Sequence, residues 1–358
     1  MQEIDIAKGM ACLLMIAAHL ISGKLLPFGT FAAPLFFACS GMNTILQIDR
    51  TRGNRCFDLF HVLFPLVLFF GGSTQVVVAH GGSLRIFPEF LQCIALAVLV
   101  LFLLGKIFRD PFHVGSLFPI PFLLHLLMPL SFLRSCGGTP LGFLFGNGFT
   151  LFPWLGFFLF GVFILRLKRR LFFLLLAALG ASAVLGLALA GGAPRKFFMS
   201  PSYIFLALLA VSLAFALARL IAAGADRVLS RGLAEIFALP GRNGLMFVYL
   251  HYFALRYFAS VDFFPAFPLY LLFEIPYLFL ACWALLLAYE KVKNEAALLF
   301  PALSLLLGLG TLRWAGLLMP RADLRLVDML IGVFFAFTYV LLRRRFAAFC
   351  VRRQAPAG

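Results

Sequence analysis

The sequence is poor in charge. Asp, Glu, Lys and Arg make up only 12% of its 358 residues, while hydrophobic residues make up 63%. Soluble domains average about a quarter charged residues, so this chain has too few charged side chains to cover a soluble surface. The mean hydropathy is +1.04, and apolar runs long enough to cross the ~30 Å hydrocarbon core of a bilayer recur along the chain. The composition therefore predicts an all-α polytopic membrane protein.

Acidic residues are scarcest among the charged ones. The chain has 14 Asp and Glu against 30 Lys and Arg, which gives a formal net charge of +16. A nucleic-acid-binding protein would collect this charge on one polar face. Here the basic residues instead lie in short loops between apolar runs. This pattern excludes nucleic acid as a partner and is typical of the charges that orient membrane spans.

Paired cysteine motifs are also missing. The chain has seven cysteines, but it contains no Cys-x-x-Cys pair and no His and Cys cluster with zinc spacing. Several of the cysteines lie within apolar runs, where a thiol behaves as a small hydrophobe. We therefore expect neither a structural disulfide nor a bound metal.

The apolar runs predict ten to twelve transmembrane helices. Of the twelve best segments, the fifth and the ninth are short or interrupted. The segments are Met10 to Leu26, Phe31 to Gln47, Phe57 to Ala79, Phe87 to Ile107, Leu117 to Leu133, Phe149 to Leu165, Leu171 to Ala190, Ser202 to Ala222, Gly244 to Ala259, Leu269 to Tyr289, Leu298 to Met319 and Leu326 to Leu342.

The loop charges predict the orientation of these spans. With the N-terminus in the cytoplasm, the inner segments hold 21 basic residues and the outer segments hold 9. Because positive charge accumulates on the cytoplasmic side, we expect both termini to be cytoplasmic. No loop is long enough for a soluble domain, so we predict one transmembrane domain over residues 1–345 and a short basic cytoplasmic tail over 346–358.

Two polar side chains in the first span share one helix face. Lys8 and His19 are eleven residues apart, which is close to three full helical turns and places His19 about 16 Å further along the axis. An ionisable residue within a span is costly and often functional. A cation near the cytoplasmic end would suit an anionic cofactor that enters from the inside. A histidine that only bonds a neighbouring helix is an equal alternative.

The same stretch carries a family resemblance. The segment IDIAKGMACLLMIAAH resembles the opening helix of the transmembrane acyltransferase superfamily. In the acyltransferase-3 family this helix carries arginine, ten residues and then histidine. Lys8 and His19 keep that spacing, but lysine replaces arginine, and lysine lacks the planar fork that binds phosphate with two parallel hydrogen bonds.

Two further segments narrow the resemblance to the heparan-α-glucosaminide N-acetyltransferase-like branch. The run LRIFPEFLQCIALA is similar to the branch pattern Arg-Ile-Pro-Gly-Val-Leu-Gln-Arg-Ile-Ala. Gln92 matches this pattern, whereas Glu89 departs from it, and we interpret Arg85 and Glu89 as an interfacial ion pair. The run LFPWLGFFLFG resembles the branch's Pro-Trp-x-Gly segment and contains Trp154.

A last segment, PGRNGLMFVYLH, resembles the branch's Gly-x-Asn-x-x-x-x-Tyr-x-x-His pattern. It matches at Gly241, Asn243 and His251. The tyrosine of the pattern falls on Val248, and Tyr249 comes one place later, so no role is carried over to this tyrosine. Gly-Arg-Asn-Gly is also an ordinary turn at the start of a helix.

The resemblance implies a membrane-embedded acyltransferase. Such an enzyme takes an acetyl or other acyl group from cytoplasmic acyl-CoA and transfers it to a sugar hydroxyl or amine at the outer face, in a bacterial plasma membrane. His19 would be the general base, and Asn243 and His251 would complete the catalytic residues. Lys8, Gln92 and Trp154 would bind acetyl-CoA, although Gln92 can also simply line a polar interior and Trp154 can anchor at the membrane interface. The resemblance implies no metal and leaves a homo-oligomer open.

Two other classes remain as alternatives. Twelve spans with both termini inside also suit a secondary transporter or a flippase for a lipid-linked sugar. Transporters usually show interrupted helices at corresponding places in two halves, and we find no such repeat. A membrane scaffold without catalysis is the third alternative, and the polar face around His19 counts against it.

Overall fold

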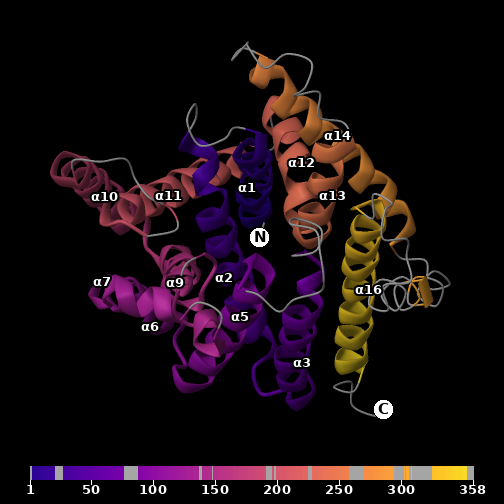
Figure 1. The fold of residues 1–358 in the computed structure, drawn as a ribbon, viewed down its shortest axis with the longest axis horizontal. Coiled ribbons are helices and arrows are strands. Elements are labelled where there is room, and N and C mark those ends of the chain that lie inside the picture. The colour runs from indigo at the N-terminus through magenta and orange to yellow at the C-terminus, as the bar shows by residue number, and fades with distance from the viewer. Residues whose placement is uncertain are drawn as a thin grey trace. The chain divides into compact units, whose positions relative to one another are not determined.

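The computed structural model contains helices and no strands in the part of the chain that it describes (Figure 1). The described residues are 2–20, 27–75, 88–136, 139–146, 148–190, 196, 199–224, 228–257, 270–293, 302, 304–305, 308 and 325–352. Six of the described helices are long and apolar enough to cross a membrane. The chain is therefore an all-α polytopic membrane protein, as the composition predicts.

The helices belong to two compact units. Unit 1 comprises residues 1–50 and 88–242, and unit 2 comprises 51–87 and 243–358. In unit 1 the elements are α1 (Gln2–Leu20), η1 (Pro27–Phe31), α2 (Ala32–Thr51), α5 (Phe90–Ile107), α6 (Pro111–Ser116), α7 (Pro119–Leu127), α8 (Leu130–Ser135), η2 (Pro140–Phe143), α9 (Leu151–Arg166), α10 (Arg169–Ala190), α11 (Pro201–Ala223) and α12 (Val228–Arg242). In unit 2 they are α3 (Arg55–Gly71), α13 (Gly244–Tyr257), α14 (Tyr270–Val292) and α16 (Arg325–Arg352).

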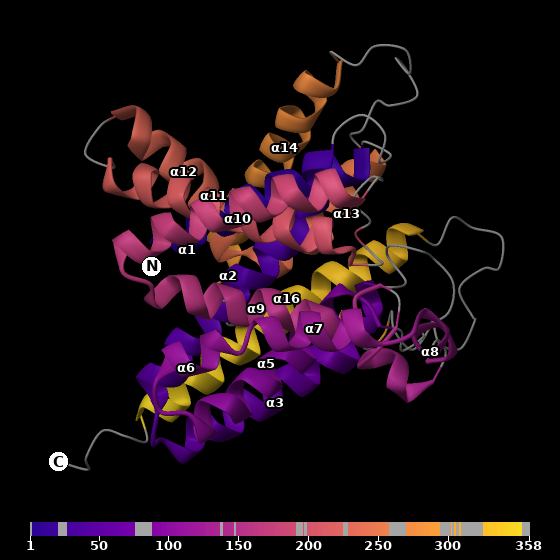
Figure 2. The ribbon, with the colours of Figure 1, turned by 90° about the vertical axis from the view of Figure 1, so that its left-hand side faces the viewer.

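Several of the predicted spans match helices closely, and α5, α10 and α11 begin and end within three residues of the prediction. Figure 2 shows α10 and α11 side by side. The span predicted over Leu117 to Leu133 is wrong as one helix, because it falls on α7 and α8. Pro119 begins α7 and Pro129 directly precedes α8, and proline favours the start of a helix over its interior.

The span predicted over Leu298 to Met319 lies almost entirely outside the described residues. The full count of spans, the cytoplasmic position of both termini and the division into a domain and a tail stay predictions.

Close backbone crossings hold unit 1 together. Helix α1 packs against α12 (Figure 1), and the two backbones approach at a glycine on each helix. A Cβ atom on Gly9 would overlap the carbonyl group of Phe237, and one on Gly241 would overlap that of Asp5. Small residues allow such approach between membrane helices. This crossing fixes the position of the helix that carries Lys8 and His19.

A second crossing of this kind joins α2 to α9. A Cβ atom on Gly41 would overlap the Phe158 carbonyl group, and one on Gly161 would overlap the Ala38 carbonyl group. Each helix thus supplies one glycine to the contact. The crossing places the start of α9, with Trp154, beside α2.

Side-chain rings hold the α3 and α16 pair of unit 2 together. The two helices run side by side (Figure 1). The Phe64 ring lies 5.7 Å from the Tyr339 ring and 5.8 Å from the Phe346 ring, centre to centre. Gly71 at the end of α3 faces Phe335 in the first half of α16, whereas Phe64, earlier in α3, contacts Phe346, later in α16. The pair is therefore antiparallel.

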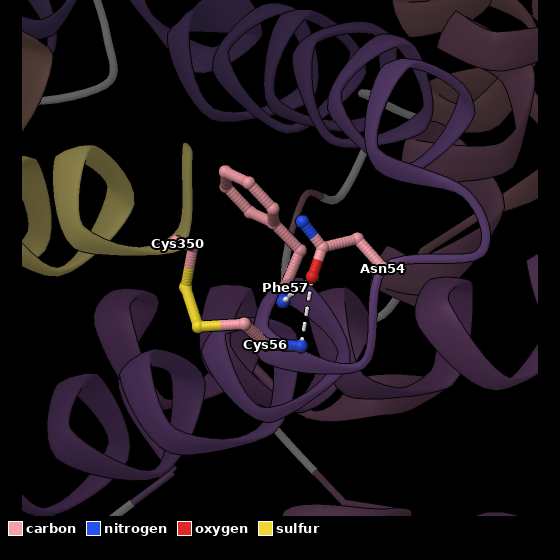
Figure 3. The surroundings of a disulfide bond; sticks show 4 residues. All are labelled: Asn54, Cys56, Phe57 and Cys350. Atoms are coloured by element: carbon pink, nitrogen blue, oxygen red, sulfur yellow. Dashed lines mark hydrogen bonds between the residues drawn. A yellow bond between two sulfur atoms is a disulfide. The ribbon is translucent and has the colours of Figure 1, made fainter. Parts of the chain in front are cut away.

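A disulfide joins Cys56 at the start of α3 to Cys350 near the end of α16 (Figure 3). The expectation that the chain has no structural disulfide is therefore wrong. The two cysteines are 294 residues apart in the sequence, and only the antiparallel pairing of the helices brings them together. Asn54 caps α3 beside the bond, because its side-chain oxygen accepts hydrogen bonds from the Cys56 and Phe57 amides at 2.9 and 3.4 Å.

Candidate functional site

The predicted polar face of the first span lies on one unbroken helix, α1. Lys8 is partly buried, and its Nζ atom lies 4.7 Å from the centre of the Phe36 ring on α2. Such a contact stabilises the cation. Asp5 lies one turn earlier and attracts the same ammonium group. These contacts hold the Lys8 side chain between α1 and α2 within unit 1.

His19 lies in the last turn of α1 and is exposed. The short helix η1 packs against this turn, where Gly29 meets the backbone of Ala18. His19 thus lies eleven residues after Lys8 on the same helix, and its role as the general base stays a prediction.

Gln92 and Trp154 are both completely buried in unit 1. The two amide atoms of Gln92 have no hydrogen-bond partner among the described residues, which is costly for a buried polar group. The indole N–H of Trp154 donates to the Gly148 carbonyl oxygen at 2.7 Å. Trp154 therefore supports the loop before α9, and its burial differs from the exposed position of an interfacial anchor.

A charged pair at the start of α5 was missed by the sequence analysis. The Glu89 carboxylate attracts the Lys196 ammonium group, and the Lys196 Nζ atom lies 5.3 Å from the centre of the Phe149 ring. Both charged side chains are partly exposed. Loss of water around the Lys196 ammonium group lowers its pKa to about 8, and Glu89 opposes this shift. Arg85, the partner that we expected for Glu89, lies outside the described residues.

An aromatic path joins Lys8 to this charged pair. The Phe36 ring lies 5.3 Å from the Phe90 ring, and the Phe90 ring lies 5.4 Å from the Phe149 ring. Lys8 rests on the first of these rings and Lys196 on the last. A chain of contacts through three phenylalanine rings, from α2, α5 and the loop before α9, thus connects the two ammonium groups. We call these rings, Phe36, Phe90 and Phe149, the aromatic septum.

Asn243 belongs to unit 2 and lies between α12 and α13. Its side-chain amide donates to Glu290 Oε1 at 2.6 Å, and Glu290 also forms an ion pair with Lys293. The bond ties the start of α13 to the end of α14. The alternative reading of Gly-Arg-Asn-Gly as a turn at the start of a helix is confirmed, because Asn243 forms the turn before α13. Its catalytic role stays a prediction.

His251 is buried on α13 with 1% of its surface exposed. Its Nδ1 atom lies 3.2 Å from the Phe247 carbonyl oxygen, one turn earlier. The Phe247 ring stacks on the imidazole at 5.9 Å, and the Tyr252 ring lies 4.1 Å away. These contacts fix the orientation of the imidazole, and its catalytic role also stays a prediction.

The six predicted site residues thus fall into two groups. Unit 1 holds Lys8, His19, Gln92 and Trp154, and unit 2 holds Asn243 and His251. In the described part of the chain, no group of three or more His, Cys, Asp or Glu side chains could hold a metal ion. Comparison of the chain with protein-family models, curated proteins and solved structures finds no match. The family resemblance therefore stays a prediction from the sequence.

Proposed function

We propose that this chain is a membrane-embedded acyltransferase that takes an acetyl or other acyl group from cytoplasmic acyl-CoA. The acceptor is a sugar hydroxyl or amine at the outer face of a bacterial plasma membrane. The observation that carries the proposal is the aromatic septum of unit 1. A separate ammonium group lies at each end of this path of three rings, and the path is short.

The loop charges support opposite sides for the two ends of the septum. They assign Lys8 to the cytoplasmic side and Lys196 to the outer side. The path from Lys8 through the three rings to Lys196 has four steps of 4.7 to 5.4 Å. Together these steps are shorter than the ~30 Å hydrocarbon core. Donor and acceptor could therefore approach each other within the thickness of the membrane.

Lys8 would attract the donor. Coenzyme A carries phosphate groups, and a lysine acts on a phosphate as a point charge. The Phe36 ring and Asp5 hold this charge at one end of the septum, the end that the loop charges predict to face the cytoplasm. Only the small acyl group then has to pass the rings.

His19 would accept the proton of the sugar hydroxyl or amine during attack on the thioester carbonyl. A neutral imidazole suits this step because its ordinary pKa lies near the working pH. An acyl-histidine intermediate would use the same side chain as the nucleophile. Either route requires His19, so the same variant tests both.

Labelled acetyl transfer provides the test. Purified protein is incubated with acetyl-CoA that carries a labelled acetyl group and with glucosamine or N-acetylglucosamine, and labelled sugar is measured by mass spectrometry. Substitution His19→Ala should reduce transfer by about 100-fold or more. The exposed His113 on α6 pairs with Asp110 at the surface, so His113→Ala is the matched control and should keep normal transfer.

Normal turnover in the His19→Ala variant would remove His19 from the mechanism. Transfer of intact sugar across vesicles, without acetylation, would replace the acyltransferase with the transporter or flippase.

A further inference from the structure

The disulfide between Cys56 and Cys350 lies among arginines. Exposed arginines flank both of its ends. They are Arg52 and Arg55 beside Cys56, and Arg343, Arg344, Arg345 and Arg352 beside Cys350. The bond holds these two groups at the same end of the α3 and α16 pair.

We expect this concentration of arginine to face the cytoplasm, because positive charge in short loops accumulates on that side of the membrane. Disulfides are rare in the cytoplasm, where they are usually transient or redox-sensing. Nearby cations also favour the thiolate form of a cysteine, which is the species that attacks disulfides. The location and the charge therefore both point to exchange rather than to a permanent crosslink.

The two cysteines differ in exposure. Cys350 is completely buried, whereas Cys56 is partly exposed at the first turn of α3. A small reagent therefore reaches Cys56 first. About one helical turn from the bond, the rings of Phe60, Phe64 and Phe346 begin to pack α3 against α16. The two helices therefore keep these contacts when the disulfide is reduced.

We propose that Cys56 and Cys350 are a reversible thiol–disulfide site that exchanges with a low-molecular-weight thiol such as glutathione. In the oxidising direction, the Cys56 thiolate attacks glutathione disulfide, forms a mixed disulfide and releases one glutathione thiolate. The Cys350 thiolate then attacks the Cys56 sulfur, forms the bond between the helices and releases the second glutathione. Glutathione disulfide is reduced, the two cysteines are oxidised, and their two protons pass to the released thiolates. Reduction follows the reverse path and begins at Cys56.

A redox titration of the purified full-length protein tests the exchange. The protein is equilibrated with series of reduced and oxidised glutathione, the free thiols are alkylated, and the peptides that contain Cys56 and Cys350 are quantified by mass spectrometry. Both cysteines should pass together from alkylated to bonded within the series. The variant Cys282→Ala, which removes a buried free cysteine of the same unit, should keep the same midpoint.

Single variants test the order of the steps. With oxidised glutathione, Cys350→Ala should collect glutathione on Cys56, whereas Cys56→Ala should leave Cys350 unmodified. If a variant does not fold, wild-type protein held at the midpoint and briefly treated with labelled glutathione should carry the label on Cys56 alone.

Two results would overturn the proposal. One is a bond that stays closed in excess reduced glutathione while the protein remains folded, which would make it a permanent crosslink. The other is a pair of thiols that never joins in excess oxidised glutathione. Equal labelling of Cys350 would reject Cys56 as the point of attack.

Discussion

The two units of this protein hold their helices together in different ways. In unit 1, glycines on α1, α2, α9 and α12 allow one backbone to contact another. In unit 2, α3 and α16 meet through phenylalanine and tyrosine rings and a disulfide. A backbone crossing has no side chain that can move aside, whereas a ring can rotate or shift. The unit with rigid crossings also holds the aromatic septum and the two lysines, Lys8 and Lys196, that contact its first and last rings.

Adding one methyl group at a backbone crossing should lower the stability of unit 1 more than any other change proposed below. Substitution Gly241→Ala places a Cβ atom on the Asp5 carbonyl group, and neither backbone can shift without moving its helix. We expect a loss of about 3 kcal/mol of stability, at the upper end of the usual cost of overpacking. Thermal unfolding in detergent should show a fall in Tm of about 4 °C, given the unfolding entropy expected of a chain of this length.

Gly232 on the same helix is the matched control, because a Cβ atom there meets nothing within 4 Å. Gly232→Ala should leave Tm unchanged or raise it slightly, since alanine favours a helix by about 1 kcal/mol over glycine. Equal Tm values for the two variants would refute the rigid crossing.

An added methyl group at the glycine between α3 and α16 in unit 2 should lower the stability less than the change at Gly241 does. A Cβ atom at Gly71 meets only the far edge of the Phe335 ring, and a small movement of that ring relieves the overlap. We expect Gly71→Ala to cost about 1 kcal/mol, near the lower end of the overpacking range. Thermal unfolding of both variants checks the comparison, and a larger loss at Gly71 than at Gly241 would reverse it.

Lys196 should give unit 1 a pH-dependent stability of its own. Its pKa is about 8 in the folded protein and about 10.4 in an unfolded chain. Between these values the unfolded chain binds more protons, so stability should rise with pH by up to about 1.4 kcal/mol per pH unit. Below the folded pKa, both states are protonated and this contribution stays constant.

Substitution Lys196→Met should remove this rise in the pH profile of Tm. Lys106→Met, which changes an exposed lysine at the end of α5, should keep it. An unchanged profile for Lys196→Met would show that the ammonium group stays well solvated.

The sequence predicts the helical membrane fold well, because composition and hydropathy determine it almost alone. The spacing of Lys8 and His19 also transfers directly to α1, since both residues lie on one helix. The disulfide could not be predicted, because the pairing of cysteines 294 residues apart depends on which helices are neighbours. The contact of Lys196 with Glu89 and Phe149 was missed for the same reason. Within the sequence, Lys196 is only one more basic residue in a loop.

Binding of the acyl donor tests the central claim most directly. Purified protein is titrated with acetyl-CoA while its thermal unfolding is followed, with free adenosine nucleotides as controls. We expect a saturable rise in Tm that is specific to the CoA ester, equivalent to about 2.7 kcal/mol when the ligand is at 100 times its Kd. In the Lys8→Glu variant the same titration should require a higher acetyl-CoA concentration. A folded protein that shows no shift with acetyl-CoA would contradict the account.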